Sequence, residues 1–399
     1  MKVLIIGSRI PWPLNDGGAI ATYNLLKGLS ELAIEVHYMS LNTKKHFVDE
    51  ATIAKEFSFL KAIKPFTIDT SISPIKALLN VFQTSSYNID RFTSLEFRDS
   101  IQAYINENNF DLIHFEGLFV SQYIDLIKTN TPTLLRQHNI EFHIWKTLAN
   151  TTQFIPKKIY LNFLANRLEK FEKRIIQKFD AVVSITEEDN HFISTQNFKG
   201  LQCAIPAGIE IKENKDCKLD YHSIYHIGSM EWMPNQEAMA WFHNDIWPKV
   251  TVKNKLVKFY MAGKNMSDSY NAWNTNQFIV AGEVKDQEAF KSDKSILVVP
   301  LKSGSGIRIK TIEAMLAKKA IVTSSQGALG LPIKNNEHCL IADNSEQFAQ
   351  AIISLTEDLD LRNKIAENGY HLALQNFSNQ AVSKRWEEFY MTLTKEKIN

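Results

Sequence analysis

The chain has 399 residues, enough for two to three domains of ordinary size. Its 45 basic and 44 acidic residues nearly cancel, so charge gives no reason to expect nucleic acid as the main partner. Hydrophobic residues make up 44% of the chain, which is typical of a packed globular core and argues against global disorder.

The cysteines argue against two kinds of stabilising site. Cys203, Cys217 and Cys339 are few, odd in number and without C-x-x-C spacing. This pattern disfavours a disulfide framework and a thiolate zinc site, and it favours a reducing cytoplasm. No apolar run approaches the ~18 residues of a spanning helix, and the first apolar stretch is too short for a secretion signal. We therefore expect a cytoplasmic protein whose chain begins with a buried strand.

Short Val/Ile/Leu runs alternate with amphipathic stretches along the whole chain. This alternation predicts parallel sheets covered by helices on both faces. The polar, charged residues 206–220 suit a linker between two domains. The expected strands are residues 3–6, 35–40, 111–115, 133–137 and 181–186 in the first half, and 223–228, 256–263, 277–282, 295–301 and 320–324 in the second.

The predicted fold is α/β, with two Rossmann-like, doubly wound domains facing each other across a cleft. Residues 1–205 form the first domain, 206–220 the linker and 221–377 the second domain. Residues 378–399 are expected to form a helix that crosses back to the first domain. Ligands in such sheets bind at the carboxyl ends of the strands.

The most informative stretch is a Gly/Ser loop that follows a predicted strand and precedes a predicted helix. Small residues let backbone N–H groups approach a ligand, and the helix N-terminus adds positive potential. Arg308 and Lys310 add formal charge, so the pattern suits a diphosphate. Glu313, placed about two turns into the helix, suits the two hydroxyls of a ribose. The competing interpretation is a Gly-rich turn with a surface Arg and Lys. The loop residues are Ser303, Gly304, Ser305 and Gly306.

Residues 304–330 (GSGIRIKTIEAMLAKKAIVTSSQGALG) resemble the donor-site signature of one enzyme family. That family is the retaining nucleotide-sugar glycosyltransferases with the GT-B fold, family four or group 1. Residues 227–235 resemble the strand–loop opening of the family's C-terminal domain, and residues 281–284 its base-binding loop. Residues 13–23 resemble its acceptor-side glycine loop. The resemblance covers nearly the whole chain.

The resemblance implies roles for particular residues. Glu313 matches the second Glu of the family's Glu-(seven residues)-Glu motif, which holds the ribose. Position 305, where the family's first Glu touches the donor sugar, is Ser here, and this leaves the sugar open. The Arg and Lys that many relatives carry after the first strand of the C-terminal domain are absent, so we assign the diphosphate to Arg308 and Lys310. Further donor-binding residues are Gly228, Glu283 and Val284, and the acceptor-side residues are Gly17 and Gly18.

A second motif follows a predicted strand of the first domain. Residues 136–141 (RQHNIE) resemble the family's His-Asn-x-Glu segment. The resemblance implies that His138 contacts the donor sugar or its departing phosphate. The competing interpretation is a loop histidine satisfied by backbone groups. Glu141 is equally consistent with a helix-capping carboxylate.

Three other signals receive ordinary interpretations. Asp358 and Asp360 match a D-x-D metal pattern but are expected to cap a helix. His222 and His226 share one face of a strand without an evident third ligand, so no metal site is expected. Residues 157–178 are basic around an apolar stripe of Tyr160, Leu164, Leu168, Phe171 and Ile175. They are interpreted as a core-packed helix with a solvated basic face, or alternatively as a contact with an anionic membrane.

The function implied is metal-independent transfer of a sugar, with retention, from a nucleotide-diphosphate sugar to a saccharide or lipid-linked saccharide. No cofactor is expected beyond the nucleotide sugar, so cationic side chains and helix amides must stabilise the leaving diphosphate. Two alternatives stay open. One is a nucleotide-sugar 2-epimerase on the same fold, and the other is a non-catalytic nucleotide-sugar-binding protein, suggested by Ser305. The expected location is the cytoplasm, peripherally at the inner face of the membrane, in polysaccharide biosynthesis.

Overall fold

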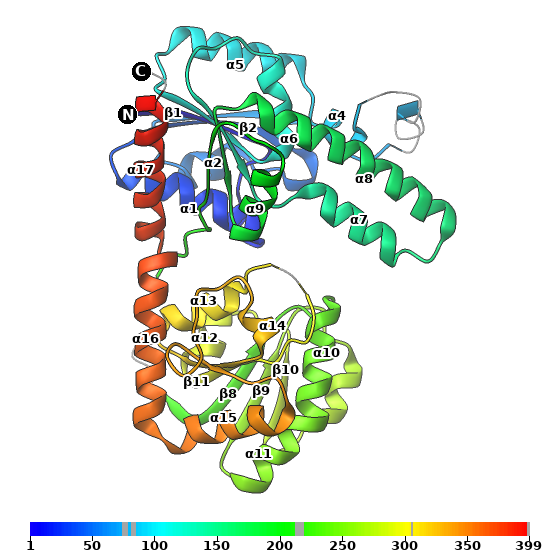
Figure 1. The fold of residues 1–399 in the computed structure, drawn as a ribbon, viewed down its shortest axis with the longest axis vertical. Helices are drawn as coiled ribbons and strands as arrows, with labels where there is room; N and C mark the ends of the chain where they lie inside the picture. Colours follow the sequence, from blue (N-terminus) through cyan, green and yellow to red (C-terminus); the bar gives the residue numbers. More distant parts are fainter. Residues whose placement is uncertain (74–78, 81–84, 212–218, 305, 397–399) are drawn as a thin grey trace. The chain divides into compact units, whose positions relative to one another are not determined.

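The computed structural model describes residues 1–73, 79–80, 85–211, 219–304 and 306–396 (Figure 1). The chain divides into two compact units. Unit 1 comprises Met1–Gly208 with Asn379–Asn399, and unit 2 comprises Ile209–Ser378. Residues 212–218 of the expected linker, and Ser305, lie outside the described residues.

Unit 1 is built on a seven-stranded parallel sheet in the order β3-β2-β1-β4-β5-β6-β7. The central strand β1 pairs with β2 and β4, which places Ile5 beside Tyr38 on one side and His114 on the other. Hydrophobic cores lie on both faces of the sheet. The strands are β1 (Lys2–Gly7), β2 (Glu35–Thr43), β3 (Ala62–Ile68), β4 (Leu112–Glu116), β5 (Thr133–Gln137), β6 (Ala181–Ser184) and β7 (Leu201–Ala204).

Helices connect these strands. Asp16 caps the first of them by accepting a hydrogen bond from the backbone N–H of Ala19. The helices of unit 1 are α1 (Gly17–Glu31), α2 (Glu50–Glu56), α4 (Tyr87–Asp90), α5 (Leu95–Glu107), α6 (Leu118–Ser121), α7 (Glu141–Thr151), α8 (Ile155–Ile175), α9 (Glu187–Thr195) and α17 (Asn379–Glu396), with 3₁₀ turns at Lys44–His46, Gln122–Asp125 and Ile176–Lys178.

The five strands expected in the first half are present, but the sequence interpretation missed β3 and β7. Both are edge strands of the sheet. An edge strand is not buried on both sides, and β3 is only partly buried along its whole length. It therefore lacks the continuous apolar run by which the central strands were recognised.

The C-terminal helix α17 packs within unit 1. Its Trp386 and Tyr390 side chains are fully buried. The guanidinium of Arg385 donates a hydrogen bond to the carbonyl of Ala204 at 2.8 Å. Gly28 of α1 faces Ser383, where a Cβ atom would meet the serine hydroxyl at 1.9 Å. The helix thus closes one face of the sheet with large aromatic side chains.

Unit 2 is built on a six-stranded parallel sheet in the order β10-β9-β8-β11-β12-β13, around one hydrophobic core. Its strands are β8 (Asp220–Ile227), β9 (Lys258–Ala262), β10 (Phe278–Gly282), β11 (Lys294–Val299), β12 (Ala320–Thr323) and β13 (Leu340–Ile341). Its helices are α10 (Met233–Trp241), α11 (Trp247–Lys253), α12 (Gln287–Ser292), α13 (Ile309–Leu316), α14 (Ser325–Ala328), α15 (Ser345–Glu357) and α16 (Leu359–Phe377), with a π-helical turn at Phe242–Ile246 and a 3₁₀ turn at Asp268–Trp273.

The helix predicted after the Gly/Ser loop is α13, and its Ile312, Met315 and Leu316 are buried as expected. The helix begins only at Ile309, with Arg308 at the N-cap. Glu313 therefore lies about one turn into the helix, and the expectation of two turns was wrong. At 3.6 residues per turn, this places the Glu313 carboxylate close to the helix N-terminus.

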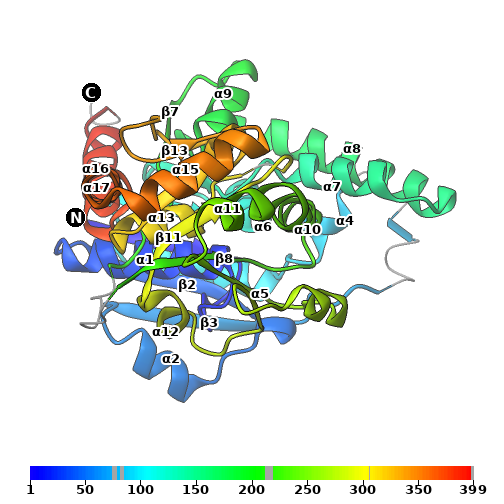
Figure 2. The ribbon, with the colours of Figure 1, turned by 90° about the horizontal axis from the view of Figure 1, so that it is seen from below.

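The antiparallel pair α7 and α8 forms a hairpin that extends away from the sheet of unit 1 (Figures 1 and 2). On α8, Leu164, Leu168 and Ile175 are buried, so the apolar stripe predicted over this helix packs against the core. None of the helices in the described ranges combines the length and the apolarity needed to cross a membrane.

Candidate functional site

A cavity of about 210 Å³ lies in unit 2, at the carboxyl ends of β8, β9 and β10. This is the edge at which open α/β sheets bind ligands. The cavity brings together five of the residues that the sequence singled out, from three separate segments. These are Gly228, Glu283, Val284, Lys310 and Glu313, and the remaining lining residues are Ile227, Ser229, Gly263, Lys264 and Gln287.

Two glycines shape this cavity. A Cβ atom on Gly263 would lie 1.9 Å from the carbonyl oxygen of Gly228. A Cβ atom on Gly228 would lie 2.8 Å from the Nζ atom of Lys310 and 2.7 Å from the side-chain nitrogen of Asn235. Any larger residue would therefore displace the backbone or the lysine. The absence of side chains leaves main-chain atoms exposed to a ligand at this position.

Lys310, in the first turn of α13, points its ammonium group at neutral partners. Its Nζ atom donates to the Nε2 atom of His226 and to the Oδ1 atom of Asn235, both at 3.2 Å. Burial, together with the positive charge of Arg308, lowers the pKa of Lys310 to about 7. No carboxylate within the described residues pairs with this ammonium at salt-bridge distance. It can therefore change its charge near neutral pH and gain an anionic partner.

The tautomer of His226 follows from its hydrogen bonds. Its Nδ1 atom lies 2.9 Å from the carbonyl oxygen of Val298, so Nδ1 carries the proton and Nε2 presents a lone pair to Lys310. Burial and the charge of Lys310 hold the pKa of His226 well below its usual value. The sequence interpretation weighed His226 only as a metal ligand and missed this role.

Glu313 is held in place from a neighbouring helix. The Nζ atom of Lys291 on α12 lies 3.2 Å from the Oε2 atom of Glu313 and 2.9 Å from the Oε1 atom of Glu288. Lys291 is 9% exposed, and its attraction to these two carboxylates outweighs burial and raises its pKa. Glu313 is more exposed than its partner, so its second carboxylate oxygen can accept hydrogen bonds from a ligand.

Arg308 and the loop before it lie beside this cavity but do not line it. The guanidinium of Arg308 donates to the carbonyl of Gly304 at 3.0 Å and lies 5.0 Å from the ring centre of Trp232. Arg308 is 5% exposed, so the interpretation of it as a surface residue is wrong. Ser303 donates to Glu237 at 2.8 Å, and Gly306, like Gly304, has a positive φ angle.

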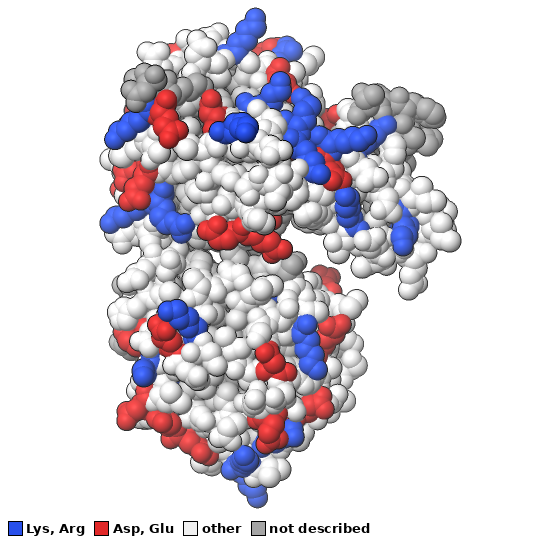
Figure 3. All heavy atoms as spheres, in the orientation of Figure 1, with Lys and Arg blue, Asp and Glu red and all other residues white. Residues whose placement is uncertain are grey.

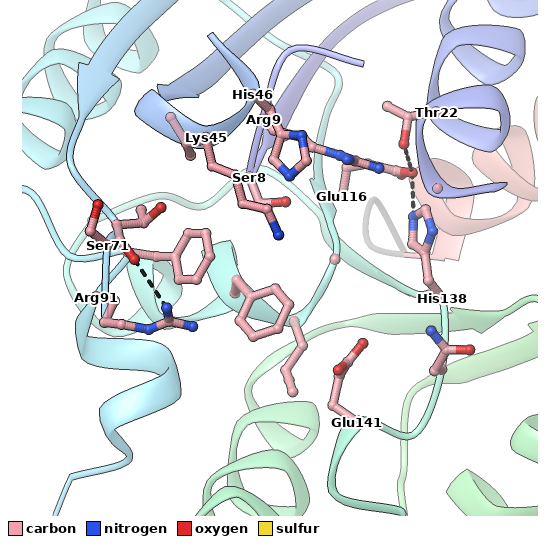
Figure 4. A pocket seen from close by; sticks show the side chains of 18 of the residues that line it. Ser8, Arg9, Thr22, Lys45, His46, Ser71, Arg91, Glu116, His138 and Glu141 are labelled. Carbon is pink, nitrogen blue, oxygen red and sulfur yellow. Dashed lines mark hydrogen bonds and ion pairs between the residues drawn. The ribbon is translucent and has the colours of Figure 1, made fainter. Parts of the chain in front are cut away.

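A larger cavity, of about 690 Å³, lies in unit 1 (Figure 4). Gly18 and His138 line it together, although 120 positions of sequence separate them. Gly17 is the first residue of α1 and does not line it. A Cβ atom on Gly18 would lie 3.9 Å from the Nδ1 atom of His138. The glycine therefore leaves free space on the open side of the imidazole.

Glu116, at the carboxyl end of β4, is the centre of a buried network in this cavity. Its Oε1 atom accepts hydrogen bonds from Thr22 and Arg136 at 2.9 Å and lies 2.7 Å from the Nε2 atom of His138 (Figure 4). Burial alone would raise the pKa of Glu116, but the charges of Arg136 and His138 hold it well below its usual value. Glu116 is thus an anion that orients His138. The interpretation that backbone groups satisfy this histidine is wrong, because its partner is a carboxylate.

Two side chains of the C-terminal helix α17 contact members of this network. The hydroxyl of Tyr390 lies 2.6 Å from the Nδ1 atom of His114, whose Nε2 atom lies 2.9 Å from the Oε2 atom of Glu116. The guanidinium of Arg136 lies 5.4 Å from the ring centre of Trp386. Sequence reasoning missed Glu116, although a carboxylate that ends a fully buried strand was a signal that could have identified it.

Glu172 of α8 fixes the start of α7, directly after the His138 segment. Its carboxylate accepts backbone N–H bonds from Glu141 at 3.1 Å and Phe142 at 3.2 Å, and a side-chain bond from Gln137 at 2.9 Å. Burial outweighs these bonds and raises the pKa of Glu172 to about 8. Glu141 is not the helix cap. It is the first residue of α7 and lines the cavity, where burial raises its pKa.

Of the other sequence signals, Asp358 is a helix cap as expected. It precedes α16 and accepts a hydrogen bond from the backbone N–H of Leu361 at 2.8 Å. In the part of the chain that the structure describes, no three His, Cys, Asp or Glu side chains are grouped so that they could hold a metal ion.

Residues 221–358 match the sequence profile of the family described as Glycosyl transferases group 1. The match runs from the first residues of β8 to the residue after α15. An uncharacterized 44.6 kDa protein in the cps region of Klebsiella pneumoniae is 23% identical over 398 residues, covering 96% of this chain and 97% of that protein.

Solved structures resemble the whole chain. HepE from Anabaena in complex with UDP is 12% identical, with a TM-score of 0.61 over 98% of this chain and all of that one. Sucrose-phosphate synthase from Thermosynechococcus elongatus is 14% identical, with a TM-score of 0.63 over 99% of this chain and all of that one. TarM is 12% identical, with a TM-score of 0.65 over 98% of each chain. The chain therefore has the GT-B fold of two Rossmann-like units, and its second unit carries the sequence profile of the group 1 glycosyl transferases.

Proposed function

We propose that the protein transfers a sugar from a nucleotide-diphosphate sugar to a saccharide or lipid-linked saccharide, with retention of anomeric configuration and without a metal ion. The observation that carries this proposal is that Lys310 and Glu313 line the same cavity at the strand ends of unit 2. A cation without a carboxylate partner at salt-bridge distance suits a diphosphate, and a half-exposed carboxylate one turn along the same helix suits the ribose hydroxyls.

The nucleotide part of the donor is held by elements of unit 2. The nucleotide base lies against Glu283 and Val284, and the diphosphate approaches the open backbone at Gly228. Lys310 has one further N–H to donate after its bonds to His226 and Asn235. Arg308 adds positive charge while it holds the loop at Gly304, so the two cations act on the leaving group together.

In the reaction, the bond between the anomeric carbon and the diphosphate oxygen breaks, and its electron pair stays on the diphosphate. The acceptor hydroxyl forms the new bond on the same face and gives its proton to the departing diphosphate oxygen. The products are a nucleoside diphosphate and a glycoside. His138, which Glu116 orients, contacts the donor sugar or its departing phosphate, and Gly18 leaves room beside it on the acceptor side.

Three of the similar proteins support this proposal. HepE has been solved with UDP and with UDP-glucose, and TarM with UDP and a GlcNAc-glycerol. The location of the Klebsiella relative in a cps region fits a polysaccharide product. These matches favour a hexose donor and a saccharide acceptor for this chain.

The decisive experiment incubates the protein with a panel of UDP-, GDP- and dTDP-sugars, with and without saccharide acceptors. A transferase releases nucleoside diphosphate, and release rises when the right acceptor is present. An epimerase instead forms the epimeric donor without any acceptor, and a sensor binds the donor but never releases nucleotide. Either of these two outcomes would overturn the proposal.

Retention and metal independence are tested on the same reaction. Proton NMR of the first product should give the anomeric configuration of the donor, and an inverted product would contradict retention. Turnover should survive EDTA and should not rise when Mg²⁺ or Mn²⁺ is restored. Lys310→Met should weaken donor binding, while Lys302→Met, which removes a lysine outside the cavity, should leave it unchanged.

We further propose that the protein touches an anionic membrane through the end of the α7–α8 hairpin. Phe154, Ile155 and Ile159 are 67%, 69% and 65% exposed at this end. Ile155 and Ile159 lie one turn apart on one face of α8, opposite the buried stripe. Figure 3 shows largely uncharged atoms at the end of this projection, on the right of the view.

The charge beside this apolar surface favours an anionic bilayer over a neutral partner. Lys157 and Lys158 lie between the exposed isoleucines and form no ion pair with any acid of the described residues. Apolar side chains that enter the interface next to free lysines are typical of peripheral membrane binding. The proposed surface therefore lies at the end of the hairpin, next to the start of the basic segment 157–178 for which the sequence left a membrane contact open.

Vesicle flotation tests this contact. Phosphatidylglycerol–phosphatidylcholine vesicles should carry the protein upward at low salt, and pure phosphatidylcholine vesicles should not. The double variant Phe154→Ser/Ile155→Ser should bind about tenfold less, because two exposed apolar side chains lose their partition energy. Leu256→Ser, which removes an equally exposed apolar side chain of unit 2, should bind like wild type. Equal flotation of the double variant would exclude this surface.

A further inference from the structure

The cavity of unit 1 is chemically different at its two ends, and this polarity has no counterpart in the sequence analysis. One end holds Glu116 and His138, with Glu141 nearby, the opposite end holds Arg91 and Ser71, and Lys45 lies beside His46 between the two ends (Figure 4). Lys45, Ser71 and Arg91 come from segments that carry no recognised motif, after β2, after β3 and after α4.

Arg91 is a cation without an anion. Its Nη1 atom donates to the carbonyl of Thr70 at 3.0 Å, while its Nε atom is buried and has no partner. No carboxylate of the described residues lies within salt-bridge distance of its guanidinium. A half-buried arginine in this state retains free donors in a planar fork, which is the geometry that carboxylates and phosphates accept.

Lys45 adds a second uncompensated charge to the lining of the same cavity. It lines the cavity and forms no ion pair with an acid in the described ranges, whereas its neighbour Lys44 pairs with Asp69 at 2.7 Å outside the cavity. Arg9 and Glu116, two other ionisable residues of the lining, are each paired, whereas Glu141 lies near His138 and its pKa is raised by burial. Arg9 pairs with Asp16, and Glu116 pairs with Arg136. The cavity thus lacks an anion at the end opposite His138.

Two aromatic rings also line the cavity. Phe92 and Phe119 stack with their ring centres 4.7 Å apart and an angle of 23° between the planes. Aromatic faces in a cavity lined by polar groups bind the apolar face of a cyclic ligand. A volume of about 690 Å³ accommodates one to two sugar rings and a charged group.

We infer that this cavity selects an acceptor that carries an oxyanion, bound by Arg91 and Lys45, while its reacting hydroxyl faces His138. This inference rests on the proposed transferase function and names the class of its acceptor. The anion is a phosphate or a carboxylate. It comes either from the diphosphate of a lipid-linked saccharide or from an acidic sugar within the acceptor.

Binding of simple anions tests the inference without a known acceptor. The probes are a short prenyl diphosphate, glucuronic acid and, as the neutral analogue, glucose. Each is titrated by calorimetry with UDP at saturation, so that the cavity of unit 2 is occupied. We expect one of the two anions to bind and glucose to bind at least tenfold more weakly. A preference for the prenyl diphosphate identifies a lipid-linked acceptor, and a preference for glucuronic acid identifies an acidic sugar.

Variants of the two cationic residues test where the anion binds. Arg91→Met and Lys45→Met should each weaken binding of the preferred anion about tenfold or more, as expected when one charged partner is lost. Lys44→Met removes the adjacent lysine outside the cavity and should bind like wild type. Arg91→Lys keeps the charge and should retain part of the affinity, which guards against misfolding as the cause. UDP binding should be the same in all four variants.

Two results would overturn the inference. One is equal anion binding in wild type, Arg91→Met and Lys45→Met, and the other is equal binding of glucose and both anions. In either case, intact UDP binding and acceptor-stimulated nucleotide release would leave the proposed function standing. Loss of UDP binding in the wild-type protein would instead contradict the proposed function itself.

Discussion

The Nζ atom of Lys310 lies 3.2 Å from the Nε2 atom of His226, and only one member of this buried pair carries a positive charge. Because the Nδ1 proton of His226 is held by Val298, the imidazole accepts a hydrogen bond and stays neutral. The lysine therefore provides the only charge of the pair and, with a pKa of about 7, it titrates in the range where cells work.

Donor binding should depend on pH through Lys310. Below pH 7 its ammonium is charged and attracts a diphosphate, and above pH 7 it must first take up a proton. The diphosphate of a nucleotide sugar has no group that titrates near neutral pH. We therefore expect its Kd to rise by up to about tenfold per pH unit above the pKa of about 7. Calorimetry with UDP-glucose between pH 6 and pH 9, roughly the working range of His and Lys groups, measures this slope.

The control for this slope is Lys302→Met, which should reproduce the wild-type profile. Lys310→Met should bind weakly and without a slope. A flat wild-type profile would show that Lys310 does not bind the diphosphate.

Arg308 should shift that profile. Its charge helps to lower the pKa of Lys310, so Arg308→Ala should raise that pKa and move the midpoint of the pH profile upward. Gln326→Ala is the matched control, since its amide also bonds to the carbonyl of Gly304 but carries no charge. The same pH series of UDP-glucose titrations distinguishes the Arg308→Ala variant from the Gln326→Ala variant. A midpoint that moves in both variants would indicate loop disorder instead of electrostatic coupling.

Glu313 should act on donor affinity. Glu313→Ala removes an acceptor for the ribose hydroxyls, and a hydrogen bond to a charged group contributes about 1.5–3 kcal/mol, or roughly tenfold and more in affinity. We expect the donor KM to rise by about this factor with little change in kcat. Glu288→Ala, which removes the other carboxylate on Lys291, should have a much smaller effect. Equal effects of the two variants would assign Glu313 to the support of Lys291 only.

His138 should act on turnover. We expect His138→Ala to lower kcat about 100-fold, within the range of a proton-transferring or charge-stabilising side chain, with the donor Kd unchanged. Glu116→Gln keeps the size of the side chain but removes the negative charge that orients His138, so it should lower kcat. His143→Ala, on the exposed side of α7, serves as the control. A His138→Ala variant with normal kcat would remove this histidine from the mechanism.

Glu172 should make stability depend on pH. Its pKa is about 8 in the folded chain and near 4.5 when unfolded, so between these values only the folded state keeps the proton. The free energy of unfolding should therefore fall as pH rises from 5.5 to 8, by about 3 kcal/mol. Glu172→Gln mimics the protonated form and should lack this decrease.

Thermal unfolding at several pH values measures the effect. The control is Glu169→Gln, three residues away on α8, whose carboxylate pairs with Lys146 and Lys173 and whose pKa is lowered. That variant should keep the wild-type slope between pH 5.5 and pH 8. A wild-type protein whose stability does not change over this range would mean that Glu172 is ionised in its buried position.

The sequence by itself predicted the alternation of strands and helices in both units, apart from the edge strands β3, β7 and β13. Runs such as Leu4–Ile6 are buried on both faces, so their apolar character is a local property that a short window of sequence reveals. The Gly/Ser loop and the helix after it are also local features, since small residues stand between a predicted strand and a predicted helix. They led to Lys310 and Glu313. The edge strands β3 and β7 escaped because solvent on one side relaxes the pattern.

Only the tertiary structure decided which charges face each other. Tyr390 reaches His114 across 276 positions of sequence, and Lys310 reaches His226 across 84. Whether Glu116 is an anion or Lys310 a cation depends on the solvent that folding removes and on the partners that it brings within a few ångströms. No local pattern encodes these surroundings, since burial and pairing arise only when distant segments pack together.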